Sequence, residues 1–349
     1  MTKRCAPTHA FAEIDTAALA HNFHTVAALG KRVIAVVKAN AYGHGLDLAV
    51  PSFLMAGCDF FAVATLDEAL SVRALAPRAD VLILGYTPPE MAPLLAKENL
   101  TQAVFSASYA KALSTNATTP VSAHLKIDGG MRRLGFEVED REGISFALRA
   151  PKLRVCGLFT HLPSVLCDKE GTRVTLAKFS ALSRDLPHLF AHAAASSALS
   201  VNEARFAAVR PGLALYGFSP FLSLRPAMRV LAPLVQIRHV KEGAPVGYDG
   251  SFVAPKDLRV GVLPIGYADG LPRNAQGHVV QLPFEKTAPV IGHICMDQCM
   301  VDLGDATAKE GDTVCVIPDF SALASRCGTI VYETLATLSP RVARLTKEA

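Results

Sequence analysis

The sequence predicts an α/β protein, with an N-terminal (β/α)8 barrel of the TIM type followed by a mostly β C-terminal domain. Short apolar runs alternate with segments of helical periodicity as far as about residue 226, which favours a parallel sheet with crossover helices. Beyond that point, β-like runs are separated by Gly and Pro turns. We therefore expect domains at 9–226 and 227–349, with residues 1–8 as a candidate addition to the second.

The apolar runs give eight predicted strands. They lie near 32–38, 60–65, 80–86, 101–105, 121–128, 154–161, 192–196 and 206–210. Eight strands that alternate with helices are typical of a closed barrel. The eighth unit is the weakest, because little helical sequence follows Arg210.

Two connecting segments show how the helices are delimited. In 14–30, apolar residues recur at helical spacing, and Gly30 is expected to stop the helix. In 65–77, Thr65 is placed to cap a helix and Glu68 follows at the capping-box position. Helices of this kind are the crossover connections that a parallel barrel needs.

Composition limits the class of protein. The chain has 349 residues, half of them hydrophobic, and a net charge of +4 without blocks of like charge. These values argue against a nucleic-acid partner and against a membrane-surface role. The N-terminus lacks the apolar core of a signal peptide, and no apolar stretch is long enough to span a membrane. The eight cysteines, scattered without a paired Cys/His set, predict no metal site. We expect a reduced, cytoplasmic protein.

Chemically active side chains follow the predicted strands. Because barrel active sites lie at the carboxyl ends of the strands, these residues are expected to share one mouth. The set is rich in cations and hydrogen-bond donors, which suits an anionic ligand, and it lacks the clustered carboxylates of a magnesium enzyme. Its members are Lys38, Tyr86, Lys126 with Asp128, His161, Ser196 and Arg210.

Lys38 is the candidate nucleophile. A partly desolvated amine can have a lowered pKa and form a Schiff base with an aldehyde, although a lone lysine at a strand end is more often a surface residue. Tyr42 and two glycines follow it, and the backbone N–H groups of Gly212 and Leu213 come after the eighth strand, a usual phosphate position in barrels. A lysine aldimine and a phosphate cradle together indicate pyridoxal 5'-phosphate.

Five sequence blocks resemble, in the same order, those of the alanine racemase family. They read AVVKANAYGHG (35–45), KIDGGMRRLGF (126–136), VRPGLALYG (209–217), GYADGLPR (266–273) and GHICMDQCMVDL (292–303). The resemblance implies a barrel with a C-terminal β domain, pyridoxal phosphate, and interconversion of L- and D-alanine that supplies peptidoglycan synthesis. It also implies a head-to-tail homodimer in which the second subunit completes each active site.

The resemblance also implies roles for individual residues. Lys38 and Tyr267 match the two bases that flank the substrate α-carbon, with Tyr267 contributed by the partner subunit. Arg210 matches the arginine that faces the pyridine nitrogen and keeps it unprotonated, and His161 matches the residue that orients this arginine. The implied cofactor-binding set is Lys38, Tyr42, His161, Ser196, Arg210, Gly212 and Leu213.

Further matches concern the substrate. Arg133 matches the arginine that binds the substrate carboxylate, and Lys126 matches a lysine that is carbamylated in some family members. Met296 and Asp297 match substrate-binding positions of the partner subunit, and Tyr248 matches a tyrosine at the site entrance.

Several positions depart from the family pattern. Ala195 stands in place of an asparagine, Gly129 in place of Thr or Ser, His293 in place of an arginine, and Pro340 in place of a phosphate-binding tyrosine. A racemase of serine, lysine or several amino acids therefore stays open as an alternative. A decarboxylase on the same barrel is disfavoured by Arg210, because such enzymes place a carboxylate against the pyridine nitrogen. A non-catalytic cofactor-binding protein is disfavoured because four matches to functional residues of the family occur together, at Lys38, Arg133, Arg210 and Tyr267.

Overall fold

The computed structural model describes residues 9–347, so Cys5 and the expected packing of residues 1–8 lie outside the described residues. The described chain divides into two compact units. The barrel unit comprises Ala17–Ala41 and Leu46–Pro226, and the β unit comprises residues 9–16, Tyr42–Gly45 and 227–347. Residues 9–16, which the sequence had placed in the barrel, thus belong to the β unit.

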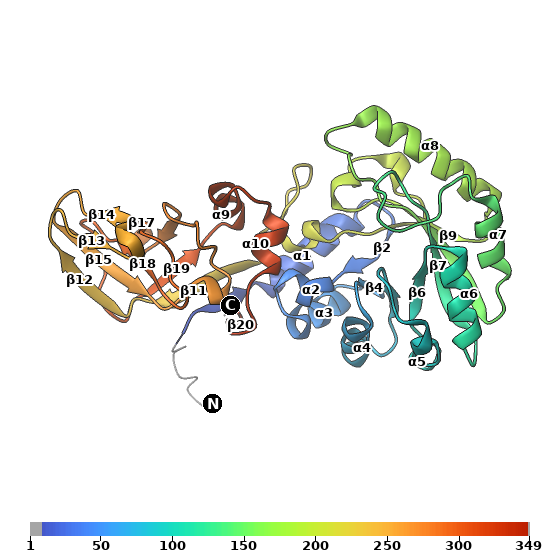
Figure 1. The fold of residues 1–349 in the computed structure, drawn as a ribbon, viewed down its shortest axis with the longest axis horizontal. Coiled ribbons are helices and arrows are strands. Elements are labelled where there is room, and N and C mark those ends of the chain that lie inside the picture. The colour runs from blue at the N-terminus through green and yellow to red at the C-terminus, as the bar shows by residue number, and fades with distance from the viewer. Residues whose placement is uncertain (1–8, 348–349) are drawn as a thin grey trace. The chain divides into compact units, whose positions relative to one another are not determined.

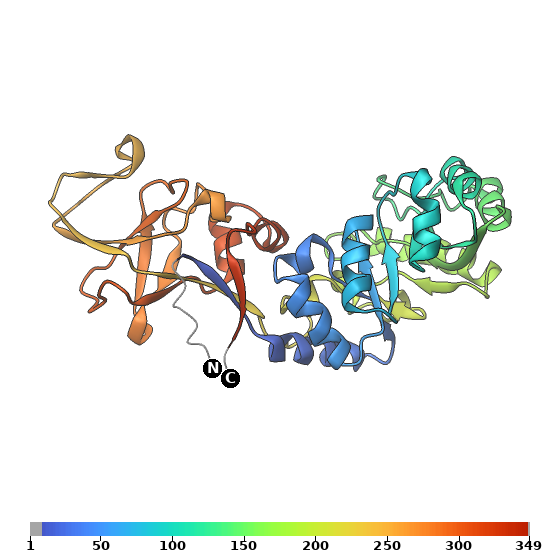
Figure 2. The same ribbon diagram turned by 90° about the horizontal axis from the view of Figure 1, so that it is seen from below.

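The barrel unit is built on one parallel sheet that closes on itself (Figures 1 and 2). Its first strand is interrupted at Ile34, so that β2 pairs with β10 while β3 pairs with β4. The split strand and seven others make an eight-stranded barrel, which confirms the predicted fold. The strands are β2 (Arg32–Val33), β3 (Ala35–Val36), β4 (Phe60–Val63), β5 (Asp80–Ile83), β6 (Thr101–Val104), β7 (Val121–Lys126), β8 (Leu153–Phe159), β9 (Phe190–His192) and β10 (Ala208–Val209).

Helices surround this sheet because their apolar faces pack on its outer surface (Figure 1). The right-handed α-helices are α1 (Thr16–Ala27), α3 (Leu46–Met55), α4 (Leu66–Leu75), α5 (Ala92–Lys97), α6 (Ala107–Asn116), α7 (Arg141–Arg149) and α8 (Lys169–Asp185). The capping box predicted for the start of α4 is present: Thr65 Oγ1 accepts from the Glu68 N–H, and the Glu68 carboxylate accepts from the Thr65 N–H.

One barrel strand differs from expectation: the seventh strand ends at His192 rather than lying near 192–196. Ala193 and Ala194 are apolar because they are buried, not because they are extended in the sheet, so apolar character alone places the strand too late. After the eighth strand comes a short 3-10 turn (Leu213–Tyr216), in agreement with the small amount of helical sequence that follows Arg210.

The segment α2 (Lys38–Tyr42) is a left-handed turn. Residues 39–42 have φ between 52° and 55°, and none of them is glycine. A left-handed conformation costs a non-glycine residue about 1–2 kcal/mol, so the surrounding structure must hold it. Glu68 Oε1 accepts from the Ala39 N–H at 2.6 Å, and Asn40 Oδ1 accepts from the Leu46 N–H at 2.9 Å.

The β unit contains a second sheet with the strand order β12-β15-β18-β17-β16-β19-β11-β1-β20. Its strands are β1 (Phe11–Ile14), β11 (Met228–Pro233), β12 (Gln236–Val240), β15 (Leu258–Leu263), β16 (Val279–Gln281), β17 (Thr287–Ile291), β18 (Cys299–Asp302), β19 (Thr313–Ile317) and β20 (Ala343–Thr346). A separate hairpin joins β13 (Pro245–Val246) to β14 (Phe252–Val253), and two helices follow, α9 (Phe320–Cys327) and α10 (Val331–Ala336).

Strand β1 explains why the first described residues leave the barrel. It lies between β11, with which it is antiparallel, and β20, with which it is parallel. Ala12 and Ile14 are completely buried in this position. The start of the chain is therefore an inner strand of this sheet. Such long-range pairing is not visible in local sequence patterns.

None of the helices in residues 9–347 combines the length and apolar character that crossing a lipid bilayer requires.

Candidate active site

Lys38 lies two residues after β3, at the carboxyl end of the sheet, and is half-buried. Burial lowers the pKa of its amine, and the positive charges of Arg133 and Arg210 lower it further, while Glu68 acts in the opposite sense. A lysine in this setting is neutral more often than a surface lysine, which is the state needed for attack on a carbonyl carbon.

Arg210, at the end of the eighth strand, is buried and firmly held. Its Nη1 donates to His192 Nδ1, its Nη2 donates to the Thr160 carbonyl at 2.8 Å, and its guanidinium lies 5.1 Å from the centre of the Phe159 ring. The histidine that accepts from Arg210, His192, lies on the adjacent strand in register with Ala208. The orienting role expected of His161 stays a prediction.

The contact with Arg210 fixes the proton positions on two buried histidines. A guanidinium only donates, so His192 Nδ1 carries no proton and His192 Nε2 donates to His124 Nδ1 at 3.0 Å. Burial lowers the pKa of His192 far below its usual range, and burial with the charge of Arg210 lowers the pKa of His124 to about 3. Both rings are therefore neutral, and Arg210 carries the positive charge of this chain of groups.

Two more groups near Arg210, Lys126 and His161, have lowered pKa values. Burial lowers the pKa of Lys126 to about 7, and the charge of Arg210 adds to this effect. The Lys126 amine donates to the Ile127 carbonyl at 2.6 Å and lies 5.5 Å from the Phe159 ring centre. Burial lowers the pKa of His161 to about 4, with contributions from Arg210 and Lys126, so its ring is neutral.

Arg133 differs from Arg210 in having no fixed partner. It is exposed, and among residues 9–347 it makes no hydrogen bond or ion pair. Its charge still reaches Lys38 and Lys126. A free guanidinium of this kind can bind a carboxylate through two parallel hydrogen bonds.

Backbone donors gather at the place where the sequence predicts a phosphate. The N–H groups of Gly212 and Ala214 converge on Ser196 Oγ at 3.0 and 3.1 Å. Leu213, the residue named from the sequence, lies between them in the chain and is half-buried. The donor set fits pyridoxal phosphate: convergent N–H groups and a hydroxyl suit a phosphate, and a lysine of lowered pKa suits an aldehyde.

At two positions, Gly43 and Gly129, nearby backbone leaves no room for a side chain, which the sequence did not reveal. A Cβ on Gly43 would lie 2.2 Å from the Leu335 carbonyl oxygen, so Gly43 allows α10 to approach the segment that carries Tyr42. A Cβ on Gly129 would lie 2.3 Å from the His161 carbonyl oxygen. Gly129 therefore adds no empty space to the site, because backbone already occupies the position of a side chain.

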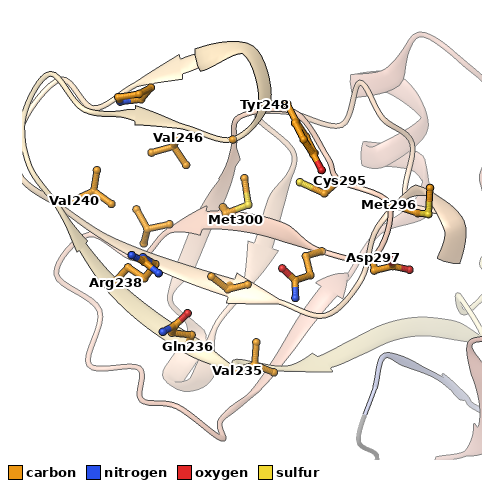
Figure 3. Close-up of a pocket in the computed structure, with 15 residues that line it drawn as sticks. Val235, Gln236, Arg238, Val240, Val246, Tyr248, Cys295, Met296, Asp297 and Met300 are labelled. Carbon is orange, nitrogen blue, oxygen red and sulfur yellow. The ribbon is translucent and has the colours of Figure 1, made fainter.

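The remaining site residues implied by the family resemblance lie in the β unit. Tyr42 is buried beside Tyr332 of α10, with 6.1 Å between the ring centres. Tyr267 begins a short 3-10 turn and is 43% exposed. Tyr248, Met296 and Asp297 line an open cavity of about 720 Å³ (Figure 3). The candidate residues thus form two groups, one in each unit.

Comparisons with known proteins identify both units. The family model "Alanine racemase, N-terminal domain" matches residues 14–220, and "Alanine racemase, C-terminal domain" matches residues 227–346. Alanine racemase of Helicobacter pylori strain G27 is 39% identical, over 96% of this chain and 98% of the relative.

Solved structures agree with the family models. Alanine racemase of Clostridium difficile 630 superposes with a TM-score of 0.92 at 29% identity, covering 99% of this chain and 97% of that one. A Bartonella henselae alanine racemase with covalently bound pyridoxal phosphate has a TM-score of 0.88 at 29% identity, with coverage of 98% and 100%. The family resemblance drawn from the sequence is confirmed.

The position of Lys126 makes stability depend on pH. Its pKa is about 7 in the folded protein and 10.5 when unperturbed, so the unfolded chain binds more protons between these values. Stability of the wild type relative to Lys126→Met should therefore rise as pH increases from 7 to 10.5, by at most about 1.4 kcal/mol per pH unit. Urea unfolding of both proteins in CO2-free buffer at several pH values measures this, and a difference that stays constant with pH would contradict it.

Proposed function

We propose that this chain, which belongs to the alanine racemase family, interconverts L-alanine and D-alanine by removing the α-proton and returning it to the opposite face. The observation that carries the proposal is Lys38, a half-buried amine at a barrel strand end whose pKa is lowered by burial and by Arg133. Such an amine can act as nucleophile and as base. We assign the product D-alanine to cell-wall peptidoglycan, a role typical of the family.

The residues of the barrel mouth support pyridoxal phosphate as cofactor. When bound, this group supplies the conjugated ring that takes up the electrons of the broken bond. Lys38 would hold its aldehyde carbon, while Ser196, Gly212 and Tyr42 would hold its phosphate. Arg210 would face the ring nitrogen, where a permanent cation keeps that nitrogen unprotonated. His161, neutral because of its lowered pKa, would line the ring.

Racemisation needs two proton-carrying groups on opposite faces of the α-carbon. Lys38 is one, and Tyr267 is the proposed other. Because Lys38 lies in the barrel unit and Tyr267 in the β unit, we propose that a second copy of the chain supplies Tyr267 in a homodimer. Met296 and Asp297 would come with it, since their loop is hydrogen-bonded to the Tyr267 turn.

Arg133 is the proposed partner of the substrate carboxylate. It is exposed and carries no ion pair among the described residues, so its guanidinium is available for a ligand. Lys126 is the proposed site of carbamylation. With a pKa of about 7, much of its amine is unprotonated near neutral pH, which is the form that reacts with carbon dioxide.

The alternative of a different amino-acid substrate gains no support from Gly129. This departure would enlarge the pocket only if a side chain could otherwise stand there, and the His161 carbonyl prevents that. Alanine, with its single methyl group, remains the substrate that the site supports best.

Substitutions of the two proposed bases should have different effects on activity and on the cofactor absorbance. Lys38→Ala is expected to lose both racemisation and the visible absorbance of bound cofactor, because it removes the attachment point. Tyr267→Phe should keep the absorbance and lose about 10²- to 10⁴-fold in kcat, because only proton transfer is removed. Spectra and chiral chromatography measure both effects, with Lys111→Ala on the exposed surface of α6 as the control. Activity and absorbance retained in Lys38→Ala would refute the proposal.

A site shared between two subunits predicts that two inactive variants recover activity when they form mixed dimers. Lys38→Ala and Tyr267→Ala are each expected to be inactive, but a mixed dimer holds one site with an intact barrel and an intact Tyr267. Mixing the two proteins should therefore restore activity, up to one working site per mixed dimer. Absence of recovery after subunit exchange has been verified by differential tagging would count against a shared site.

A further inference from the structure

Two loops of the β unit are packed together as one body. The Tyr267 N–H donates to the Cys295 carbonyl and the Ala268 N–H donates to the Met296 carbonyl, both at 3.0 Å. A Cβ on Gly266 would lie 2.3 Å from each of these two carbonyl oxygens, so the close approach requires glycine at this position. The backbone thus couples the position of Tyr267 to the loop that carries Asp297.

A completely buried carboxylate, that of Asp269, lies at the base of the Tyr267 turn. Its Oδ2 accepts from the Gly266 N–H at 2.9 Å, which closes the turn. Its Oδ1 lies 3.0 Å from His9 Nε2 and 3.2 Å from Arg341 Nε. A buried carboxylate needs such partners, because the cost of leaving it unpaired is large.

The same arginine reaches the second loop. Arg341 Nη2 donates to Asp297 Oδ1 at 2.8 Å, while its Nε faces Asp269. The segment that carries Arg341 is itself held, since the Ser339 N–H donates to the Asp269 carbonyl and Arg344 Nη1 donates to the Ser339 carbonyl. A planar guanidinium can hold two carboxylates in two fixed directions, which the single ammonium of lysine cannot do.

We propose that Arg341 is a positioning residue for racemisation, which fixes Tyr267 and Asp297 relative to each other by bridging Asp269 and Asp297. The inference rests on the proposed function, in which the chain lends these residues to its partner's active site. Arg341 touches no reacting atom. It acts by keeping the tyrosine hydroxyl in place, and a displacement of about 1 Å at a reacting group can cost about 100-fold in rate.

The direct test is Arg341→Lys, which keeps a positive charge near buried Asp269 and removes the bridge. We expect kcat to fall about 10- to 100-fold with KM changed by less than about threefold, since the interaction serves the reacting geometry. The cofactor absorbance should not change. Arg229→Lys is the control, because Arg229 is equally exposed, lies in the same unit and pairs with Glu13 at 2.7 Å. Unchanged kcat in Arg341→Lys, or an equal loss in the control, would overturn the proposal.

Mixed dimers separate positioning from general damage to the fold. Arg341→Lys chains mixed with Lys38→Ala chains should form one site of wild-type kcat, whose barrel comes from the first chain and whose loops come from the second. Mixing Arg341→Lys with Tyr267→Ala should give no gain, because both changes affect the lent loops. Rescue by Tyr267→Ala without rescue by Lys38→Ala would mean that Arg341 acts on the barrel of its own chain, and would overturn the proposal.

The mixture of Lys38→Ala with Tyr267→Ala serves as a reference. It distinguishes failure of the role proposed for Arg341 from failure of the proposed function. If Lys38→Ala and Tyr267→Ala do not complement each other, the proposal of a shared site is wrong. The role proposed for Arg341 in the partner's active site is then wrong as well. If they do complement but Arg341→Lys is not rescued by Lys38→Ala, the shared site stands and the role of Arg341 is refuted.

Discussion

Burial beside permanent positive charges in the mouth of the barrel sets the protonation states on which the site depends. Lys38, Lys126 and His161 all have lowered pKa values, chiefly because burial disfavours their charged forms and also because each faces Arg210. A guanidinium stays charged under all ordinary conditions, so its neighbours give up their protons instead. Burial, together with the charges of Arg133 and Arg210, thus favours an unprotonated amine at Lys38 and a neutral imidazole at His161.

Arg210 can exert this effect because the barrel interior holds it in a polar chain. His192 and the Thr160 carbonyl accept its hydrogen bonds, and His124 completes the chain. A Cβ on Gly157 would lie 2.4–2.5 Å from the His124 ring, so a glycine on β8 provides the room for that ring. The interior of this barrel therefore combines apolar packing with a buried polar chain that runs from the Thr160 carbonyl through Arg210 and His192 to His124.

Local sequence patterns were sufficient for much of this architecture. Apolar runs located the eight strands, and Thr65 with Glu68 gave a helix start that the structure confirms. Lys38 and Arg210 could be placed at strand ends because both follow such runs directly. His192 could not, because the apolar run 193–195 shifted the predicted strand and placed this histidine at its beginning.

Other features depend on contacts that no local pattern reports. Strand β1 pairs with β11 and β20, more than two hundred residues away in the chain. The left-handed turn after Lys38 is held by Glu68, which the sequence identified only as a capping residue. The roles of Gly43 and Gly129 become clear only when the backbone that faces them is known. Such positions are where sequence reasoning is expected to fail, since tertiary contacts determine them.

Whether this site racemises alanine can be measured by chiral analysis of single L-amino acids incubated with the purified, cofactor-loaded protein. We expect D-alanine to form faster than the D-enantiomer of serine, lysine or any other amino acid tested. Faster conversion of another amino acid would contradict the assigned substrate. Absence of racemisation for every amino acid would contradict the proposed function.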